Sequence, residues 1–306
     1  MAVSSMSEVN FDSLSMSQDE ACDCIYRMLA KIGVAEDLNV SDDTIRHFAN
    51  EIPDYYNHVP FHCFQHCVMV SQMTFLVLTR CSLGKSIGQR QSTSLILAAL
   101  CHDMQHPGLS NEYLLRTGHE FAQAYKTSPL ENHHIACAHK LMSSGIANCI
   151  PDSEREQLLR DMREYILATD LSNHTGIMTE VETITPIFDI ANPSHLQTLC
   201  KLVLKCSDVS NECRPQPVAS RWLNKLNEEF WAQGDQEKSE GFTPKPIMDR
   251  EMADIGHQQV GFLSDLVIPM FEDLCKLVPP FEDLALTSLR ASLQHYSAAV
   301  EDQATV

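Results

Sequence analysis

Hydrophobic residues recur at helical spacing along most of the chain from Asp19 onward. No run of short segments alternates polar and apolar positions, as half-buried strands would. The segments with the clearest helical pattern are 65–78, 94–103, 132–142, 154–169, 196–207 and 218–233. The breaks between such segments are too short and too mixed in composition to be interdomain linkers. The pattern predicts one compact all-α domain of many helices, spanning residues 19–306.

The first 18 residues are rich in Ser and Met and have no clear period. We therefore expect a flexible N-terminal segment at residues 1–18. This segment also lacks the basic start and apolar stretch of a signal peptide. The longest apolar run, Leu95 to Cys101, is far shorter than the ~20 residues that cross a bilayer. Both observations predict a cytoplasmic protein with no membrane-spanning segment in this chain.

Charge and cysteine content narrow the class further. A net charge of −19 argues against a nucleic-acid polymer as partner, because proteins that bind such polymers need a basic face. A small anionic substrate would then require local positive charge, which metal ions supply. The 12 cysteines include no C-x-x-C pair and lie mostly in apolar or helical stretches. We interpret them as reduced thiols rather than a disulfide framework.

Two histidines four residues apart, His62 and His66, are the first candidate for chemistry. On a helix this spacing places both imidazoles on one face, where they serve a common site. The alternative is two histidines near a helix start with no shared role. The pair therefore needs support from other parts of the chain.

Two further segments place carboxylates after buried helices. His102 and Asp103 follow the apolar run LILAALC, and Asp208 follows another apolar helical stretch. Burying these groups is costly unless they are paired or bind a metal. Taken singly, each could be a helix cap or an ion-pair partner. Together with His66 they give two imidazoles and two carboxylates, a set that suits zinc, while Asp103 plus waters suits a second, harder ion such as Mg²⁺ or Mn²⁺.

A pair of cations about 3.5–4 Å apart holds and deprotonates a bridging water while it neutralises a phosphate. The prediction is therefore a phosphohydrolase that uses a metal-bridged hydroxide. His62 is predicted to protonate the departing oxygen, and Glu131 to orient His62 and keep it protonated. Candidates for holding metal-bound waters are His106, Asn132, Thr169 and Asp170.

These motifs resemble the class I cyclic nucleotide phosphodiesterases. The segment HDMQHPGLSNEY, from His102 to Tyr113, matches the family signature H-D-x-x-H-x-G-x-x-N at every fixed position. Further matching segments, in the family's order, are FHCFQHCVMVSQ, SPLENHHIACA, LATD, KCSDVSNECRP, EKSEGFTPKPIMDRE and HQQVGFLSDLVIPMFE. The resemblance implies an all-α catalytic domain of about sixteen helices that converts a 3′,5′-cyclic nucleotide to its 5′-monophosphate. It also implies zinc at His66, His102, Asp103 and Asp208, magnesium sharing Asp103, and His62 as proton donor.

Within the family, the segments PFHCFQHC, EKSEG and PIMDRE are most similar to the high-affinity cGMP-specific branch. The resemblance implies that Gln259 hydrogen-bonds the purine and that Phe262 stacks on it. Their three-residue spacing puts both on one helical face. Phe230 stands where that branch has a tyrosine, and Gln258 replaces a small residue. The predicted base pocket comprises Gln259, Phe262, Gln258, Phe230, Met248 and Leu226.

The favoured substrate is cGMP, a small cyclic purine nucleotide. Because a glutamine amide can turn either its donor or its acceptor to a purine, a cAMP-selective or dual-specific enzyme is the alternative. A hydrolase of linear nucleotides would need basic residues for a triphosphate, and the region around the site is not rich in them. A catalytically inactive binding module should have lost a ligand or the proton donor, and none is lost here. A homodimer is left open.

Overall fold

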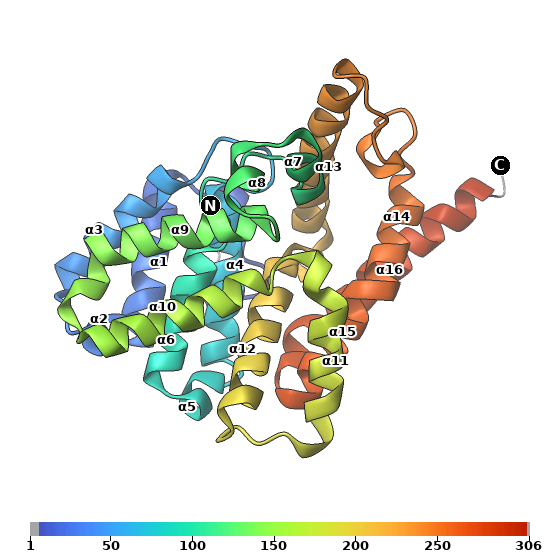
Figure 1. The fold of residues 1–306 in the computed structure, drawn as a ribbon. Helices are drawn as coiled ribbons and strands as arrows, with labels where there is room; N and C mark the ends of the chain where they lie inside the picture. Colours follow the sequence, from blue (N-terminus) through green and yellow to red (C-terminus); the bar gives the residue numbers. More distant parts are fainter. Residues whose placement is uncertain (1–5, 305–306) are drawn as a thin grey trace.

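The computed structural model describes residues 6–304 and consists of helices joined by short turns (Figure 1). No strand occurs within residues 6–304, so the predicted all-α class is confirmed. No helix in this range is long and apolar enough to cross a bilayer. The α-helices are α1 (Gln18–Ile32), α2 (Val34–Leu38), α3 (Asp42–Glu51), α4 (Phe64–Thr79), α5 (Leu83–Ile87), α6 (Gln89–Cys101), α7 (Asn111–Thr117), α8 (Glu120–Ala124), α9 (Pro129–Ser144), α10 (Asp152–Leu167), α11 (His174–Ile184), α12 (Pro193–Asp208), α13 (Gln216–Ser239), α14 (Ile255–Phe262), α15 (Ile268–Leu277) and α16 (Phe281–Ala304).

Short irregular helical turns join several of these helices. Most are 3₁₀ turns, and η8 is a single turn of π-helix that continues directly from α14. Such π-turns occur often beside functional sites. The turns are η1 (Ser13–Ser15), η2 (Ile52–Tyr55), η3 (Ile146–Cys149), η4 (Leu171–Asn173), η5 (Thr185–Ile187), η6 (Ser210–Cys213), η7 (Pro246–Met248) and η8 (Leu263–Val267).

The core is built around α4, α6, α10 and α12, which lie together in the middle of Figure 1. Helices α4 and α6 pack against each other, α10 packs on α6, and α12 packs on α4 and α10. Every residue from His66 to Leu78 is buried, as is every residue from Ser92 to Cys101. A helix that is apolar all round has to lie in the interior. Functional groups at the ends of these helices therefore lie deep in the molecule.

Two glycines allow close backbone approaches near the ends of these elements. Gly108, in the turn after α6, has φ +73°, and a Cβ there would lie 3.2 Å from the Val59 side chain. Gly234, within α13, lies so close to the following loop that a Cβ would be 1.8 Å from the carbonyl oxygen of Met248. The positive φ favours glycine at position 108, and the contact with the Met248 carbonyl requires glycine at position 234. The contact at Gly234 brings the loop before α14 against α13.

The N-terminal segment differs from the prediction. Residues 1–5 lie outside the described residues, but Phe11 is only 1% exposed and belongs to the core. The amide of Gln72 on α4 donates to the carbonyls of Met6 and Glu8, both at 2.9 Å. The prediction of a flexible segment at residues 1–18 is therefore corrected for residues 6–18, which the structure describes. The backbone carbonyls of this polar segment accept hydrogen bonds from buried donors, and a search for hydrophobic periodicity does not detect such contacts.

Candidate functional site

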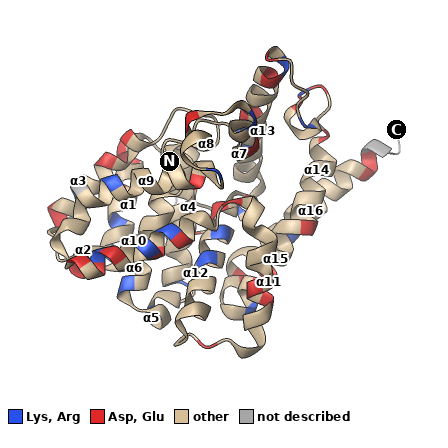
Figure 2. Ribbon diagram, viewed as in Figure 1, with Lys and Arg blue, Asp and Glu red and all other residues tan. Residues whose placement is uncertain are grey.

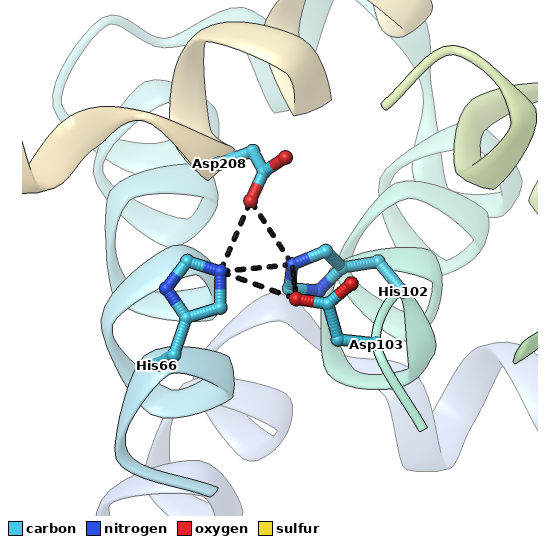
Figure 3. Close-up of side chains that lie close together, drawn as sticks. All are labelled: His66, His102, Asp103 and Asp208. Atoms are coloured by element: carbon cyan, nitrogen blue, oxygen red, sulfur yellow. Dashed lines mark hydrogen bonds and ion pairs between the residues drawn. The ribbon is translucent and has the colours of Figure 1, made fainter. Parts of the chain in front are cut away.

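Four side chains from three core helices converge at one point (Figure 3). His66 lies in the first turn of α4, His102 and Asp103 directly follow α6, and Asp208 is the last residue of α12. Nε2 of His66 lies 3.0 Å from Oδ1 of Asp208 and 3.4 Å from Oδ2 of Asp103. Nε2 of His102 lies 3.2 Å and 3.1 Å from the same two oxygens. The four predicted metal ligands are thus brought together, and we call them the ligand cluster.

The donor atoms of this cluster fit a cation. Nδ1 of His102 donates to the Ala99 carbonyl at 2.9 Å, so Nε2 faces the cluster and, in the neutral ring, offers its lone pair to a cation. Nε2 of His102 lies 3.2 Å from the Nε2 atom of His66, so one cation can reach both nitrogens. Oδ2 of Asp103 is buried without a hydrogen-bond partner among the described residues. All four donor atoms lie within 4.8 Å of one another, which a shared cation would explain.

The electrostatics of the cluster are dominated by mutual attraction. Burial by itself lowers the pKa of the His102 imidazole, but the charges of Asp103 and Asp208 outweigh it and raise that pKa well above its ordinary value. Burial would likewise raise the pKa of the Asp103 carboxyl, but the neighbouring imidazoles hold it well below its usual range. The site therefore favours positive charge between two ionised carboxylates.

His62 lies beside this cluster and pairs with Glu229 of α13. The Nδ1 atom of His62 contacts Oε1 of Glu229, whose other oxygen accepts the backbone N–H of Phe61 at 2.8 Å. Burial lowers the pKa of His62, yet the Glu229 carboxylate outweighs it and raises that pKa to about 9. Burial opposes ionisation of Glu229, but the charge of His62 lowers its pKa to about 2. The pair with Glu229 therefore favours the protonated form of His62.

The prediction that Glu131 orients His62 is corrected by these contacts. Oε2 of Glu131, near the start of α9, accepts the Asn111 amide at 2.9 Å. Burial, and then the charge of Asp170, raise the pKa of the Glu131 carboxyl to about 7. Glu131 therefore contacts Asn111, and Glu229 is the carboxylate that contacts His62. Glu131 still lines the cavity described below.

His106 stacks on His62, with ring centroids 4.0 Å apart. Its Nδ1 accepts the backbone N–H of Gly108 at 3.0 Å, so Nε2 carries the proton of the neutral ring. Burial, and then the charge of His62, hold the pKa of His106 well below its ordinary value. His106 thus places a neutral ring beside a protonated one.

The other residues predicted to hold metal-bound waters divide into two groups. Thr169 and Asp170 line the cavity, and Asp170 accepts hydrogen bonds from Ser128 and from the backbone of Ser172. Asn132 does not line it. Its amide instead donates to the carbonyls of Thr127 and Ser128 at the start of its own helix, so that prediction is wrong. Asparagine at a helix start commonly bonds nearby backbone.

A cavity of about 660 Å³ opens over these groups. That volume is typical of a site for a small molecule. Its lining includes His62, Asp103 and Asp208, so the cavity reaches both the ligand cluster and the protonated histidine. All six residues of the predicted base pocket line the same cavity: Gln259, Phe262, Gln258, Phe230, Met248 and Leu226.

Sequence reasoning missed a carboxylate that holds Gln259. The Nε2 atom of Gln259 donates to Oε2 of Glu212, and Nδ2 of Asn211 donates to the other oxygen of that carboxylate at 2.7 Å. Burial raises the pKa of Glu212 to about 7. Glu212 lies four residues after Asp208 in the segment KCSDVSNECRP. This short spacing from a proposed metal ligand was the signal from which Glu212 could have been predicted.

When the chain is compared with known proteins, the residues that line this cavity fall within the range that matches one family. Residues 61–289 match the family described as 3′5′-cyclic nucleotide phosphodiesterase. The matched range contains the ligand cluster, His62, Glu229 and the residues around Gln259.

Individual relatives extend the similarity over nearly the whole chain. The chain is 36% identical over 298 residues to the high affinity cGMP-specific 3′,5′-cyclic phosphodiesterase 9A of Homo sapiens, covering 96% of this chain and 50% of that protein. It is 32% identical over 280 residues to the cGMP-specific 3′,5′-cGMP phosphodiesterase 3 of Dictyostelium discoideum, covering 90% and 60%. A 3′,5′-cyclic-AMP phosphodiesterase, isoform F, of Drosophila melanogaster is 32% identical over 277 residues, with 86% and 42% covered. The chain thus spans about half the length of these relatives.

Proposed function

Because this chain belongs to the 3′,5′-cyclic nucleotide phosphodiesterase family, we propose that it hydrolyses a 3′,5′-cyclic nucleotide, with cGMP favoured, to the nucleoside 5′-monophosphate. One observation carries the proposal. The ligand cluster and His62, whose protonated form is favoured, lie next to each other at the cavity. Gln259 and Phe262 line the same cavity. The site thus has groups for a phosphate and groups for a base within one volume.

In the proposed reaction, water attacks phosphorus, the bond from phosphorus to O3′ breaks, and O3′ leaves with a proton. His62 supplies that proton from Nε2, because Nδ1 is engaged by Glu229. The charge of Glu229 keeps His62 protonated until the bond breaks. When bound, cations at His66, His102, Asp103 and Asp208 neutralise the phosphate and acidify the attacking water.

We propose zinc as the tightly bound cation, since two imidazoles and two carboxylates are common zinc ligands. For a second cation that shares Asp103 we propose Mg²⁺ or Mn²⁺, because these ions favour carboxylates and water. Glu131, Thr169 and Asp170 supply oxygen atoms on the same cavity wall for such waters. None of the twelve cysteines is paired, which favours a reducing compartment, and we propose a cytoplasmic location.

The contact between Gln259 and Glu212 supports selectivity rather than dual specificity. The ionised form of Glu212 only accepts hydrogen bonds, so it holds Nε2 of Gln259 toward itself and fixes which way the amide faces. Because the pKa of Glu212 is about 7, this orientation is held most firmly above neutral pH. At position 6 of the purine, guanine carries an acceptor oxygen and adenine a donor amino group. A fixed amide therefore favours one purine, and the names of the relatives with 36% identity favour guanine.

The direct test is kinetics with cGMP, cAMP and GTP side by side, alongside the Phe230→Tyr variant. We expect cGMP to have the highest kcat/KM. In Phe230→Tyr, a new phenol beside the base pocket should raise the cGMP to cAMP ratio of kcat/KM by about 3–10-fold, the effect of one hydrogen bond worth ~1 kcal/mol.

Phe188→Tyr is the matched control, since Phe188 is also half-buried but does not line the cavity. Release of phosphate from GTP without cleavage of either cyclic nucleotide would refute the proposed function. An unchanged ratio in Phe230→Tyr would remove only Phe230 from the selectivity argument.

Replacing Glu229 by glutamine should move the alkaline limit of activity to lower pH. The acidic form of His62 is lost as pH rises through its pKa, which Glu229 raises to about 9. Without that charge, burial should bring the pKa to about 6.5 or below. We therefore expect kcat in Glu229→Gln to fall about 10-fold or more at pH 8, with a much smaller loss near pH 6.

The measurement is kcat as a function of pH from 6 to 10. Glu228→Gln is the control, because Glu228 is adjacent in sequence but exposed. An alkaline limb that stays near pH 9 in Glu229→Gln would show that another group sets it.

A further inference from the structure

Among the described residues that line the cavity, Lys245 is the only lysine or arginine. Its side chain is 60% exposed, so it lies where the cavity meets solvent. The carboxylates in the lining are Asp103, Glu112, Glu131, Asp170, Asp208 and Glu212. Cations bound at the ligand cluster would compensate Asp103 and Asp208. They would not compensate Glu112 and Asp170, nor the ionised fractions of Glu131 and Glu212, whose pKa values are raised to about 7. In a chain of net charge −19, an anionic nucleotide approaches this opening against repulsion. Besides His62 next to the ligand cluster, Lys245 is the one basic side chain in the described lining whose positive charge attracts it.

The backbone holds Lys245 in place. It lies between Pro244 and Pro246, and its carbonyl accepts the N–H of Met248 at 2.8 Å in the turn η7. Proline restricts both its own φ and the conformation of the residue before it. Gly234 lets this loop lie directly against α13. The lysine therefore projects from a defined point of the cavity wall.

Across the opening, Lys245 forms an ion pair with Glu112 of α7. Both side chains are 60% exposed, and an exposed pair of this kind contributes little net stability. Separate contacts join α7 to the end of α13, since Arg116 pairs with Glu237 at 2.7 Å and Tyr113 donates to Glu240 at 2.8 Å. Charged segments of both signs gather at this outer end of α13 (Figure 2). The Lys245–Glu112 pair is thus free to break without releasing the wall.

We propose that Lys245 captures the anionic nucleotide at the opening, exchanging the carboxylate of Glu112 for the phosphate as the ligand enters. The proposal rests on the proposed function and adds to it a residue outside the ligand cluster and the base pocket. Lys245 and Glu112 then have opposite effects, since the lysine attracts the ligand while the glutamate both repels it and competes for the lysine.

The test compares Lys245→Gln, Glu112→Gln and the wild type in steady-state kinetics with cGMP at low and high ionic strength. At about 0.01 M, where the Debye length is about 30 Å, kcat/KM should fall about two- to five-fold in Lys245→Gln and rise by a similar factor in Glu112→Gln. At 1 M, where that length is about 3 Å, both differences should disappear. The value of kcat should change little in either variant.

Lys238→Gln is the control for net charge. Lys238 pairs with Asp249 and does not line the cavity, so its loss should lower kcat/KM at about 0.01 M by a smaller factor than Lys245→Gln does. If the pair instead only holds α7 to the loop, both cavity variants will lose activity, and the loss will persist at 1 M salt. Either that result or unchanged kcat/KM in Lys245→Gln overturns the proposal.

Equilibrium binding of 5′-GMP provides a measurement that needs no turnover. Its phosphate carries about −1.5 to −2 charges, compared with one on the cyclic nucleotide, so its Kd should rise by a larger factor in Lys245→Gln than KM does for cGMP. An inactive wild type would refute the proposed function, while this titration would still decide the role of Lys245. An unchanged Kd for 5′-GMP would count against capture.

Discussion

Asp208→Ala is expected to abolish metal-dependent turnover, with kcat/KM lower by about 10³-fold or more. The carboxylate of Asp208 lies between the two imidazoles, 3.0 Å from Nε2 of His66 and 3.2 Å from Nε2 of His102. Its loss removes a proposed ligand and leaves the buried imidazoles of His66 and His102 without the charge that would balance a cation. Metal catalysis is worth several kcal/mol, and each 1.36 kcal/mol is a factor of ten in rate.

Metal content by elemental analysis, measured on the same samples as kcat/KM, checks this expectation. The content should fall in Asp208→Ala and stay unchanged in Asp235→Ala, a control whose exposed carboxylate pairs with Arg250 outside the site. If Asp208→Ala kept wild-type turnover, the assignment of the metal ligands would be wrong. Loss of turnover with full metal content would instead place Asp208 in contact with the substrate.

His62→Ala should lower kcat by about 10²–10⁴-fold while the metal content is retained, which is the usual contribution of a positioned general acid. The ring of His62 lies beside the ligand cluster but is held by Glu229 of α13. A substrate with a good leaving group should separate its role from a structural one. Bis(p-nitrophenyl) phosphate releases a phenolate that needs no proton, so the variant should lose far less activity on it than on cGMP. Equal losses on both substrates would exclude proton donation by His62.

The convergence of the four proposed ligands could be predicted from the sequence because their segments carry local signals. His102, Asp103 and Asp208 each follow a long apolar helix, and charged groups at such positions need a partner. Their order along the chain, together with the signature beginning at His102, also predicted the family, which the match over residues 61–289 confirms. Each of these signals lies within a short stretch of sequence, where hydrophobic periodicity and residue spacing are informative.

Partners that are distant along the chain could not be predicted in this way. Glu229 lies 167 residues from His62 and stands in an unremarkable helical run, so only the packing of α13 brings it to the site. Glu131 was assigned to His62 because it is a carboxylate among histidines, yet the start of α9 turns it to Asn111. Asn132, one residue further on, bonds its own helix start instead of the cavity. In all three cases the orientation of a helix determines which partner the side chain reaches, and this orientation cannot be predicted from a single sequence.

The attachment of the N-terminal segment has a practical consequence. A shortened protein that began at Asp19, where the helical pattern begins, would keep every proposed ligand and the whole family match. It would nevertheless remove the Val9 carbonyl, which accepts from Arg214 at 3.1 Å, and both carbonyl acceptors of Gln72. Each unsatisfied buried donor costs ~1–3 kcal/mol, and Arg214 is only 1% exposed. Arg214 stands two positions after Glu212, so such a shortened protein would lose support next to the residue that hydrogen-bonds Gln259. Recombinant work on this domain should therefore start before Met6.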